Sequence, residues 1–302
     1  MQNNDIIPEL SFSLIESGNS EAIDILSKAL KNHGFFSITN HGLSKDLINK
    51  CYESSKNFFD LDYAVKNSYN SVGSKGARGY TPKGIETAVG ESVPDQKEFW
   101  HHGPNIDDTY DKNIPENLII NEISQFNSNF DELYAELHTI GTKVLSVIAQ
   151  VIGLESDYFK PWVEKGNSLL RSIHYPPVKN SSNPHRARAH EDINLITLLI
   201  GAEEGGLEIL NKDGNWLTVQ PSSDAIVCNI GDMMQLVTDK ELKSTTHRVI
   251  QDKDKESKSR YSIPFFLHPA PSINLKSVFR DEDEGILANE FLDQRLKEIK
   301  LY

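Results

Sequence analysis

The sequence predicts a mainly β fold with flanking helices, of the α+β class, built on a jelly-roll core. Eight short runs rich in β-branched and aromatic residues follow one another from Ser168 to Leu267, separated by turn signals such as NKDGN and PSSD. Runs at this spacing are typical of an antiparallel double sheet. A long helical period and an irregular glycine-rich segment precede them. We expect one packed unit, because the long helix needs a surface on which to bury its apolar stripe.

The N-terminal region, residues 1–110, is predicted to contain helices, a strand and an irregular wall. Residues 20–33 have apolar groups at helical spacing, residues 35–40 form a strand-like run, and helical spacing returns from Ser44. Six glycines and three prolines interrupt any period over residues 73–105. Because long irregular segments in compact domains are usually functional or disordered, and this one carries aromatic residues that can pack, we expect an ordered active-site wall.

The next region, residues 111–160, is predicted to hold one long amphipathic helix. From Ile120 onward, apolar residues recur at steps of three and four as far as position 151, and Gly153 can end the helix. We expect it to serve as a scaffold along a sheet. The jelly-roll core is assigned to residues 165–270, and the tail, residues 271–302, is expected to be helical around NEFLDQRLKEI.

Composition and charge exclude several classes of protein. The chain of 302 residues is 38% hydrophobic and 25% charged, with a net charge of −13 and scattered basic residues. This balance argues against a nucleic-acid or anionic-membrane partner. There is no apolar stretch of roughly 18 residues and no signal peptide, so we expect a cytoplasmic protein. Cys51 and Cys228 lie far apart and suggest no disulfide framework.

The stretch RARAHEDINLITLLI suggests a metal site. His190 and Asp192 stand two apart on what the pattern predicts as a strand, so their side chains should share one face. A distant histidine, His247, follows another apolar run. Two histidines and one carboxylate on one side of an octahedral ion are typical of non-haem Fe(II) oxygenases. A zinc hydrolase with three protein ligands is a chemical alternative.

A basic residue accompanies these candidate ligands. Arg260 and Ser262 stand two apart on one predicted strand, and Tyr175 lies on another. A buried guanidinium needs a partner, and a dicarboxylate cosubstrate could supply one through a bidentate pair. Ser262 and Tyr175 could add neutral hydrogen bonds to the same anion.

These elements together resemble the isopenicillin N synthase-like branch of the Fe(II)/2-oxoglutarate-dependent oxygenases. The resemblance covers nearly the whole chain and rests on GFFSITNHGL, RGYTPKGIET, DQKEFWHHG, RSIHYPP, HED, HRV and RYS. One departure is that Ile173 stands where many plant members carry the Asn of an N-x-Y motif, so an amide contact to 2-oxoglutarate is absent while Tyr175 is kept.

The resemblance implies a double-stranded β-helix core. It also implies Fe(II) held by His190, Asp192 and His247, and 2-oxoglutarate whose distal carboxylate meets Arg260 and Ser262. The implied activity is that of a dioxygenase that uses O₂ to oxidise a small polar molecule, by default through hydroxylation, with release of succinate and CO₂.

Two alternatives stay open at the level of sequence. An oxidase of the same family would use no 2-oxoglutarate, and Arg260 and Ser262 would then hold a carboxylate of its substrate. A non-catalytic small-molecule binder could also keep this fold, although all three candidate ligands are present.

Candidate substrate contacts come from the irregular wall and the strand before the metal motif. Arg78, Tyr80 and Arg171 are expected to contact a small polar substrate, whereas Lys83 and Lys97 are expected to be solvated surface residues. The histidines expected to have structural or surface roles are His101, His102, His174 and His185.

Overall fold

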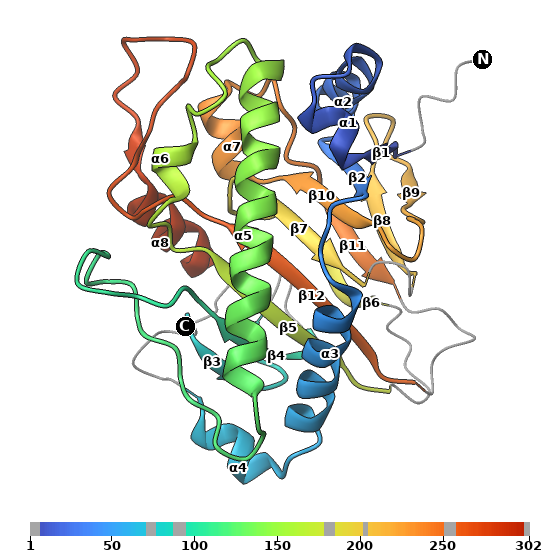
Figure 1. Ribbon diagram of the computed structural model, residues 1–302, viewed down its shortest axis with the longest axis vertical. Helices are drawn as coiled ribbons and strands as arrows, with labels where there is room; N and C mark the ends of the chain where they lie inside the picture. The colour runs from blue at the N-terminus through green and yellow to red at the C-terminus, as the bar shows by residue number, and fades with distance from the viewer. Residues whose placement is uncertain are drawn as a thin grey trace.

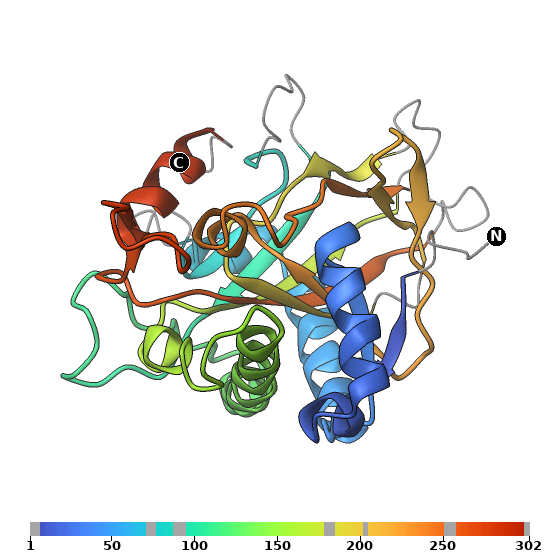
Figure 2. The same ribbon diagram turned by 90° about the horizontal axis from the view of Figure 1, so that it is seen from above.

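The computed structural model describes residues 7–70, 77–86, 95–177, 185–201, 205–250 and 258–298. It has three layers, with helices on one face of an eight-stranded major sheet and a four-stranded minor sheet on the other (Figures 1 and 2). The predicted fold of a jelly-roll core with flanking helices is confirmed. Among the described residues, no helix is both long enough and apolar enough to cross a membrane.

The first two strands form one edge of the major sheet, and the helices that follow extend over its face to the opposite edge. The side chain of Asn19 accepts a hydrogen bond from the backbone N–H of Ala22 at the start of the first long helix. The elements are β1 (Glu9–Ser11), α1 (Phe12–Glu16), α2 (Ser20–Asn32), β2 (Phe35–Thr39), α3 (Lys45–Phe59) and α4 (Tyr63–Ser68).

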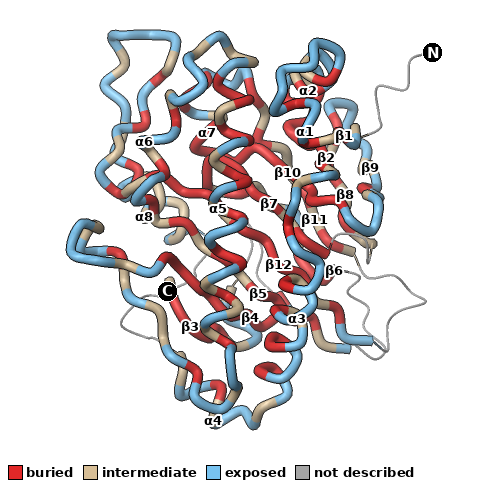
Figure 3. The backbone as a smooth tube through the Cα atoms, viewed as in Figure 1, coloured by how far each residue is buried: buried red, intermediate tan, exposed pale blue. Residues whose placement is uncertain are grey.

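Helix α5 (Phe126–Val151) lies along the major sheet as predicted, followed by the short α6 (Lys160–Val163). It begins at Phe126 rather than near Ile120. Gln125 has a left-handed backbone (φ 61°), and the Asn127 side chain bonds the backbone of Leu118 and Ile120, so the preceding segment is held as a loop. The buried strands and the exposed outer side of α5 are visible in Figure 3.

The two sheets face one another across the barrel interior. The major sheet has the order β1-β2-β10-β7-β12-β5-β4-β3 and the minor sheet β6-β11-β8-β9; every pairing within them is antiparallel except β1 with β2. The strands are β3 (Gly79–Thr81), β4 (Glu98–His102), β5 (Leu169–Tyr175), β6 (His185–His190), β7 (Ile196–Ile200), β8 (Leu207–Leu210), β9 (Trp216–Thr218), β10 (Ile226–Ile230), β11 (His247–Ile250) and β12 (Arg260–Leu267).

The irregular segment predicted over residues 73–105 contributes β3 and β4 to the edge of the major sheet. Its residues 73–76 and 87–94 lie outside the described ranges. The tail forms a small two-stranded sheet and one helix, namely β13 (Asn274–Leu275), β14 (Ile286–Leu287) and α8 (Ala288–Glu298).

One predicted strand is a helix. MMQLVT, one of the eight runs expected to be strands, lies in α7 (Asp232–Val237) as far as Val237, and this helix begins directly after Gly231. A Cβ at Gly231 would lie 2.2 Å from the carbonyl oxygen of Asn194, so glycine is required for this close approach. A short apolar run does not by itself distinguish a buried strand from a buried helical turn.

A buried ionic group ties β4 to the helical layer. Glu98 accepts hydrogen bonds from Lys66 Nζ at 2.9 Å and Tyr80 Oη at 2.6 Å, and its other oxygen lies 2.8 Å from His174 Nδ1. Burial alone would raise the pKa of Glu98, but these partners lower it to about 2. The folded protein therefore favours the ionised carboxylate.

The Glu98→Gln variant should lose stability in a pH-dependent way. Since the folded pKa lies below the unfolded value of about 4.3, the carboxylate stabilises the fold above that pH and the contribution is lost as pH falls towards 2. We expect a gap in the free energy of unfolding of up to about 3 kcal/mol near neutral pH that narrows in acid. Denaturant titrations at several pH values measure this difference in the free energy of unfolding, with Glu53→Gln as an exposed control. A difference that does not change with pH would contradict the lowered pKa of Glu98.

Candidate metal centre and cosubstrate site

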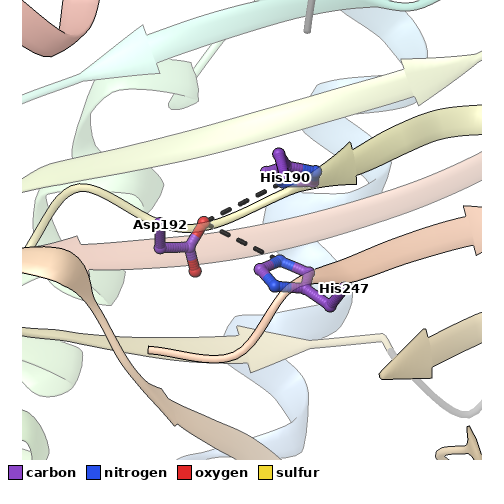
Figure 4. Close-up of side chains that lie close together, drawn as sticks. All are labelled: His190, Asp192 and His247. Carbon is purple, nitrogen blue, oxygen red and sulfur yellow. Dashed lines mark ion pairs between the residues drawn. The ribbon is translucent and has the colours of Figure 1, made fainter. Parts of the chain in front are cut away.

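Three side chains that can bind a metal converge in the barrel interior (Figure 4). His190 ends β6, His247 begins β11, and the two residues are paired directly across the minor sheet. Asp192 Oδ1 lies 4.0 Å from His190 Nε2 and 3.8 Å from His247 Nε2. One ligand atom from each residue lies within 4.8 Å of the other two, which is a separation that a single cation can bridge.

The backbone positions of His190 and Asp192 differ from the prediction made from the sequence. β6 ends at His190, and Asp192 lies in the loop that leads to β7, so the expectation that both share one face of a strand is wrong. The turn brings the carboxylate back beside the two imidazoles. The backbone N–H of Asp232, at the start of α7, holds this turn by donating to the Asp192 carbonyl at 2.7 Å.

Hydrogen bonds to the far side of each candidate ligand fix its orientation. His190 Nδ1 donates to the Arg188 carbonyl at 2.7 Å, and His247 Nδ1 donates to the Thr245 carbonyl at 3.1 Å. Because a carbonyl oxygen can only accept, the proton of each neutral ring is on Nδ1 and the lone pair of Nε2 is free for a metal.

The carboxylate is held in the same manner. Asp192 Oδ2 accepts from Thr197 Oγ1 at 2.6 Å and from Asn229 Nδ2 at 2.8 Å, which leaves Oδ1 for the centre of the cluster. Neither Thr197 nor Asn229 was predicted from the sequence. The available signal was a polar residue within each of two otherwise apolar strands.

Protonation states also suit a cation. Burial and the neighbouring His247 lower the pKa of His190 to about 4, so this ring is neutral at pH 7. Burial alone would raise the pKa of Asp192, yet the two histidines and its two hydrogen-bond donors lower it below the ordinary value. Neutral imidazoles and an ionised carboxylate are the forms that bind divalent metals, so the three residues fit an Fe(II) ion.

The candidate cosubstrate residues also come together. Arg260 is paired with Tyr175 across β12 and β5, and its guanidinium lies 5.3 Å from the centre of the Tyr175 ring. Ser262 follows on the same face of β12. Arg260 is 5% exposed, and its Nε and Nη1 have no hydrogen-bond partner among the described residues. Unpartnered buried donors are costly, so the site fits an anionic ligand.

Two of the predicted substrate contacts lie elsewhere. Tyr80 packs against Phe58 beneath the helices and donates to Glu98. Arg78 is buried against Gly103 and donates to the Ala77 carbonyl and to Asn167 Oδ1. Tyr80 contacts Phe58 of α3, and Arg78 interacts with Tyr134 of α5. Both side chains therefore lie on the helical side of the major sheet, and we assign neither a substrate contact.

Arg171 lies on the inner side. Its Nε donates to His101 Nε2 at 2.6 Å, and Nη1 lies 3.2 Å from Glu86 Oε2. Lys97, predicted to be solvated, is only 5% exposed, and its Nζ lies 2.5 Å from Glu86 Oε1 and 2.9 Å from Asp95 Oδ2. The prediction for Lys97 was wrong because the sequence does not reveal the two carboxylates that compensate its buried charge.

The other histidines have partners that suit structural roles. His102 Nε2 lies 2.7 Å from Asp131 Oδ1, and His174 bridges Glu98 and Ser259. The side chain of His185 lies outside the described part of the chain.

Comparisons with known proteins agree with this geometry. Residues 166–269 match the family profile of the 2OG-Fe(II) oxygenase superfamily, and residues 7–122 match the profile described as non-haem dioxygenase in morphine synthesis N-terminal. A 2-oxoglutarate-dependent dioxygenase of Didymella fabae is 32% identical over 308 residues, covering 94% of this chain and 92% of that protein.

Solved structures extend the likeness to the whole fold. A Caulobacter crescentus protein described as belonging to the 2OG-Fe(II) oxygenase family is 40% identical, with a TM-score of 0.86 and coverage of 97% of this chain and 99% of that one. A full-length Neurospora crassa protein, solved in complex with α-ketoglutarate (2-oxoglutarate) and thymine, is 25% identical, with a TM-score of 0.84 and coverage of 98% of both chains. The chain therefore belongs to the 2OG-Fe(II) oxygenase superfamily, whose members use Fe(II) and 2-oxoglutarate.

Proposed function

We propose that His190, Asp192 and His247 hold the catalytic Fe(II) ion, and that the enzyme hydroxylates a small polar molecule. The observation that carries this proposal is the convergence of two Nε2 atoms on Asp192 Oδ1, at 4.0 and 3.8 Å, while the opposite atom of each side chain is occupied by a hydrogen bond. Three protein ligands on one side of an octahedral ion leave three positions for cosubstrate and oxygen.

We further propose that Arg260 binds the distal carboxylate of 2-oxoglutarate, with Ser262 and Tyr175 as neutral partners. Bound Fe(II) supplies the chemistry that couples O₂ and 2-oxoglutarate to oxidation of the substrate, with succinate and CO₂ as coproducts. Arg260 orients the cosubstrate and compensates its far charge. Ile173, in place of an amide side chain, belongs to the same buried apolar cluster as Tyr175.

The family assignment favours the dioxygenase over the two alternatives. A relative named as a 2-oxoglutarate-dependent dioxygenase and a neighbour solved with α-ketoglutarate support a cosubstrate role for the Arg260 site. An oxidase would turn over without 2-oxoglutarate, and a binder would not turn over at all. A requirement for 2-oxoglutarate therefore distinguishes the three.

The first test mixes protein, Fe(II) and 2-oxoglutarate without oxygen, records the weak visible charge-transfer band, then admits O₂ and measures succinate with candidate substrates. The His190→Ala and Asp192→Ala variants should lose the band and succinate formation while keeping the circular dichroism of the wild type, because each removes a metal ligand. Normal turnover in either variant would refute the assigned site.

The Arg260→Ala variant should mainly weaken 2-oxoglutarate binding. Removal of one partner of a buried charged pair costs about 2 kcal/mol or more, so the Kd for 2-oxoglutarate should rise at least about 30-fold while Fe(II) affinity changes little. Calorimetric titration under argon measures both, with the exposed Arg280→Ala as control. An unchanged Kd would show that Arg260 does not hold the cosubstrate.

The Thr197→Val variant tests the support of the carboxylate without removing a ligand. Loss of the 2.6 Å hydrogen bond to Asp192 Oδ2 should lower Fe(II) affinity about 10- to 100-fold. Competition against a metal-binding dye measures the change, and Thr139→Val on the exposed side of α5 is the matched control. Equal affinities in the two variants would remove Thr197 from the site.

A further inference from the structure

A buried charged network borders the metal site on the side of β4 and β5. It consists of Glu86, Asp95, Lys97, Arg171 and Arg188. Lys97 forms ion pairs with both carboxylates, and Arg171 forms one with Glu86. Arg188 Nε lies 4.0 Å from Asp95 Oδ1. Its members come from both sheets, so the network spans the barrel interior.

The network reaches both proposed binding sites. Arg188 provides the carbonyl oxygen that accepts from His190 Nδ1 at 2.7 Å. Arg171 and Tyr175 lie on the same face of β5. A molecule that contacts Lys97 or Arg171 from the interior would therefore lie beside the metal and the cosubstrate.

The carboxylate oxygens of the network are already occupied. Glu86 presents one oxygen to Lys97 and the other to Arg171, while Asp95 presents one to Lys97 and faces Arg188 with the other. Burial alone would raise the pKa of Glu86, but Lys97 and Arg171 lower it, so the carboxylate stays ionised. Each carboxylate oxygen of the network therefore already faces a cation.

Hydrogen-bond donors, in contrast, remain available. Arg171 uses Nε for His101 and Nη1 for Glu86, and no hydrogen bond joins its Nη2 to another residue in the described ranges. Lys97 pairs there with two carboxylates and has three N–H donors. The guanidinium carbon of Arg171 lies 4.3 Å from the centre of the Phe99 ring and 5.3 Å from the centre of the Phe266 ring.

The charges of the network also favour an anionic ligand group. Three cations face two carboxylates, and His101 accepts from Arg171 through Nε2, so this ring is not a doubly protonated cation. The donors that remain on Lys97 and Arg171 therefore belong to cationic groups. An anionic ligand group would accept them through charge-assisted hydrogen bonds.

We propose that Arg171 and Lys97 bind a carboxylate of the primary substrate, so that the enzyme acts on a small carboxylic acid. Glu86 is a positioning residue that orients both cations, and Phe99 and Phe266 form the apolar walls beside the bound group. This inference rests on the proposed function, because it places the acid next to the iron and 2-oxoglutarate.

The experiment uses the Fe(II) protein under argon with saturating 2-oxoglutarate, so that the Arg260 site is filled. Calorimetry measures binding of phenylacetate and hexanoate against their neutral amides. The wild type should bind at least one acid about tenfold more tightly than its amide, because charge-assisted hydrogen bonds are roughly twice as strong as neutral ones. In Arg171→Gln this preference should disappear. It should persist in Arg248→Gln, whose arginine pairs with Glu208 on the minor sheet.

Circular dichroism and 2-oxoglutarate binding show whether each variant is folded. If Arg171→Gln is not, Arg171→Lys replaces it: loss of the planar fork should reduce the acid preference at least about threefold with the charge retained. Equal binding of acids and amides would show recognition of a neutral carbonyl, and would overturn the proposal. Absence of binding, or a preference that survives in the Arg171 variants, would also overturn it. Intact Fe(II) and 2-oxoglutarate binding in those cases would leave the proposed function standing.

Discussion

The active site depends on the different roles of the two carboxylate oxygens of Asp192. One oxygen is fixed by Thr197 and Asn229 at 2.6 and 2.8 Å, and the other faces two imidazoles whose protons lie on the far side. A buried carboxylate between two imidazoles carries a negative charge that a divalent cation would compensate. The hydrogen bonds to His190 Nδ1, His247 Nδ1 and Asp192 Oδ2 together direct the lone pair of the opposite atom of each side chain to the centre of the cluster.

The two sheets divide the tasks of the active site. The minor sheet sets His190 opposite His247, and the major sheet supplies Thr197 and Asn229 from neighbouring strands together with Arg260 and its partners. Helix α5 covers the opposite face of the major sheet, where the larger apolar cluster lies. The helical layer therefore supplies most of the apolar burial, and the barrel interior holds the polar and charged groups of the active site.

Much of this arrangement could be predicted from the sequence. The alternation of apolar residues located the strands of the jelly roll, and the steps of three and four located α5, because both periods reflect one buried face. The types and order of His190, Asp192 and His247 indicated a metal site. The exact path of the backbone could not be predicted: Asp192 lies in a loop, and α7 replaces a strand, because these depend on tertiary contacts at Gly231. Lys97 was misplaced for a similar reason, since burial of its charge is decided by partners distant in sequence.

The most direct measurement is a crystal structure of the protein grown without oxygen in the presence of Fe(II) and 2-oxoglutarate. The account predicts one metal peak bonded to His190 Nε2, Asp192 Oδ1 and His247 Nε2, with the far carboxylate of 2-oxoglutarate against Arg260. A metal bonded through Asp192 Oδ2 or lying outside these three residues, or a cosubstrate turned away from Arg260, would contradict it.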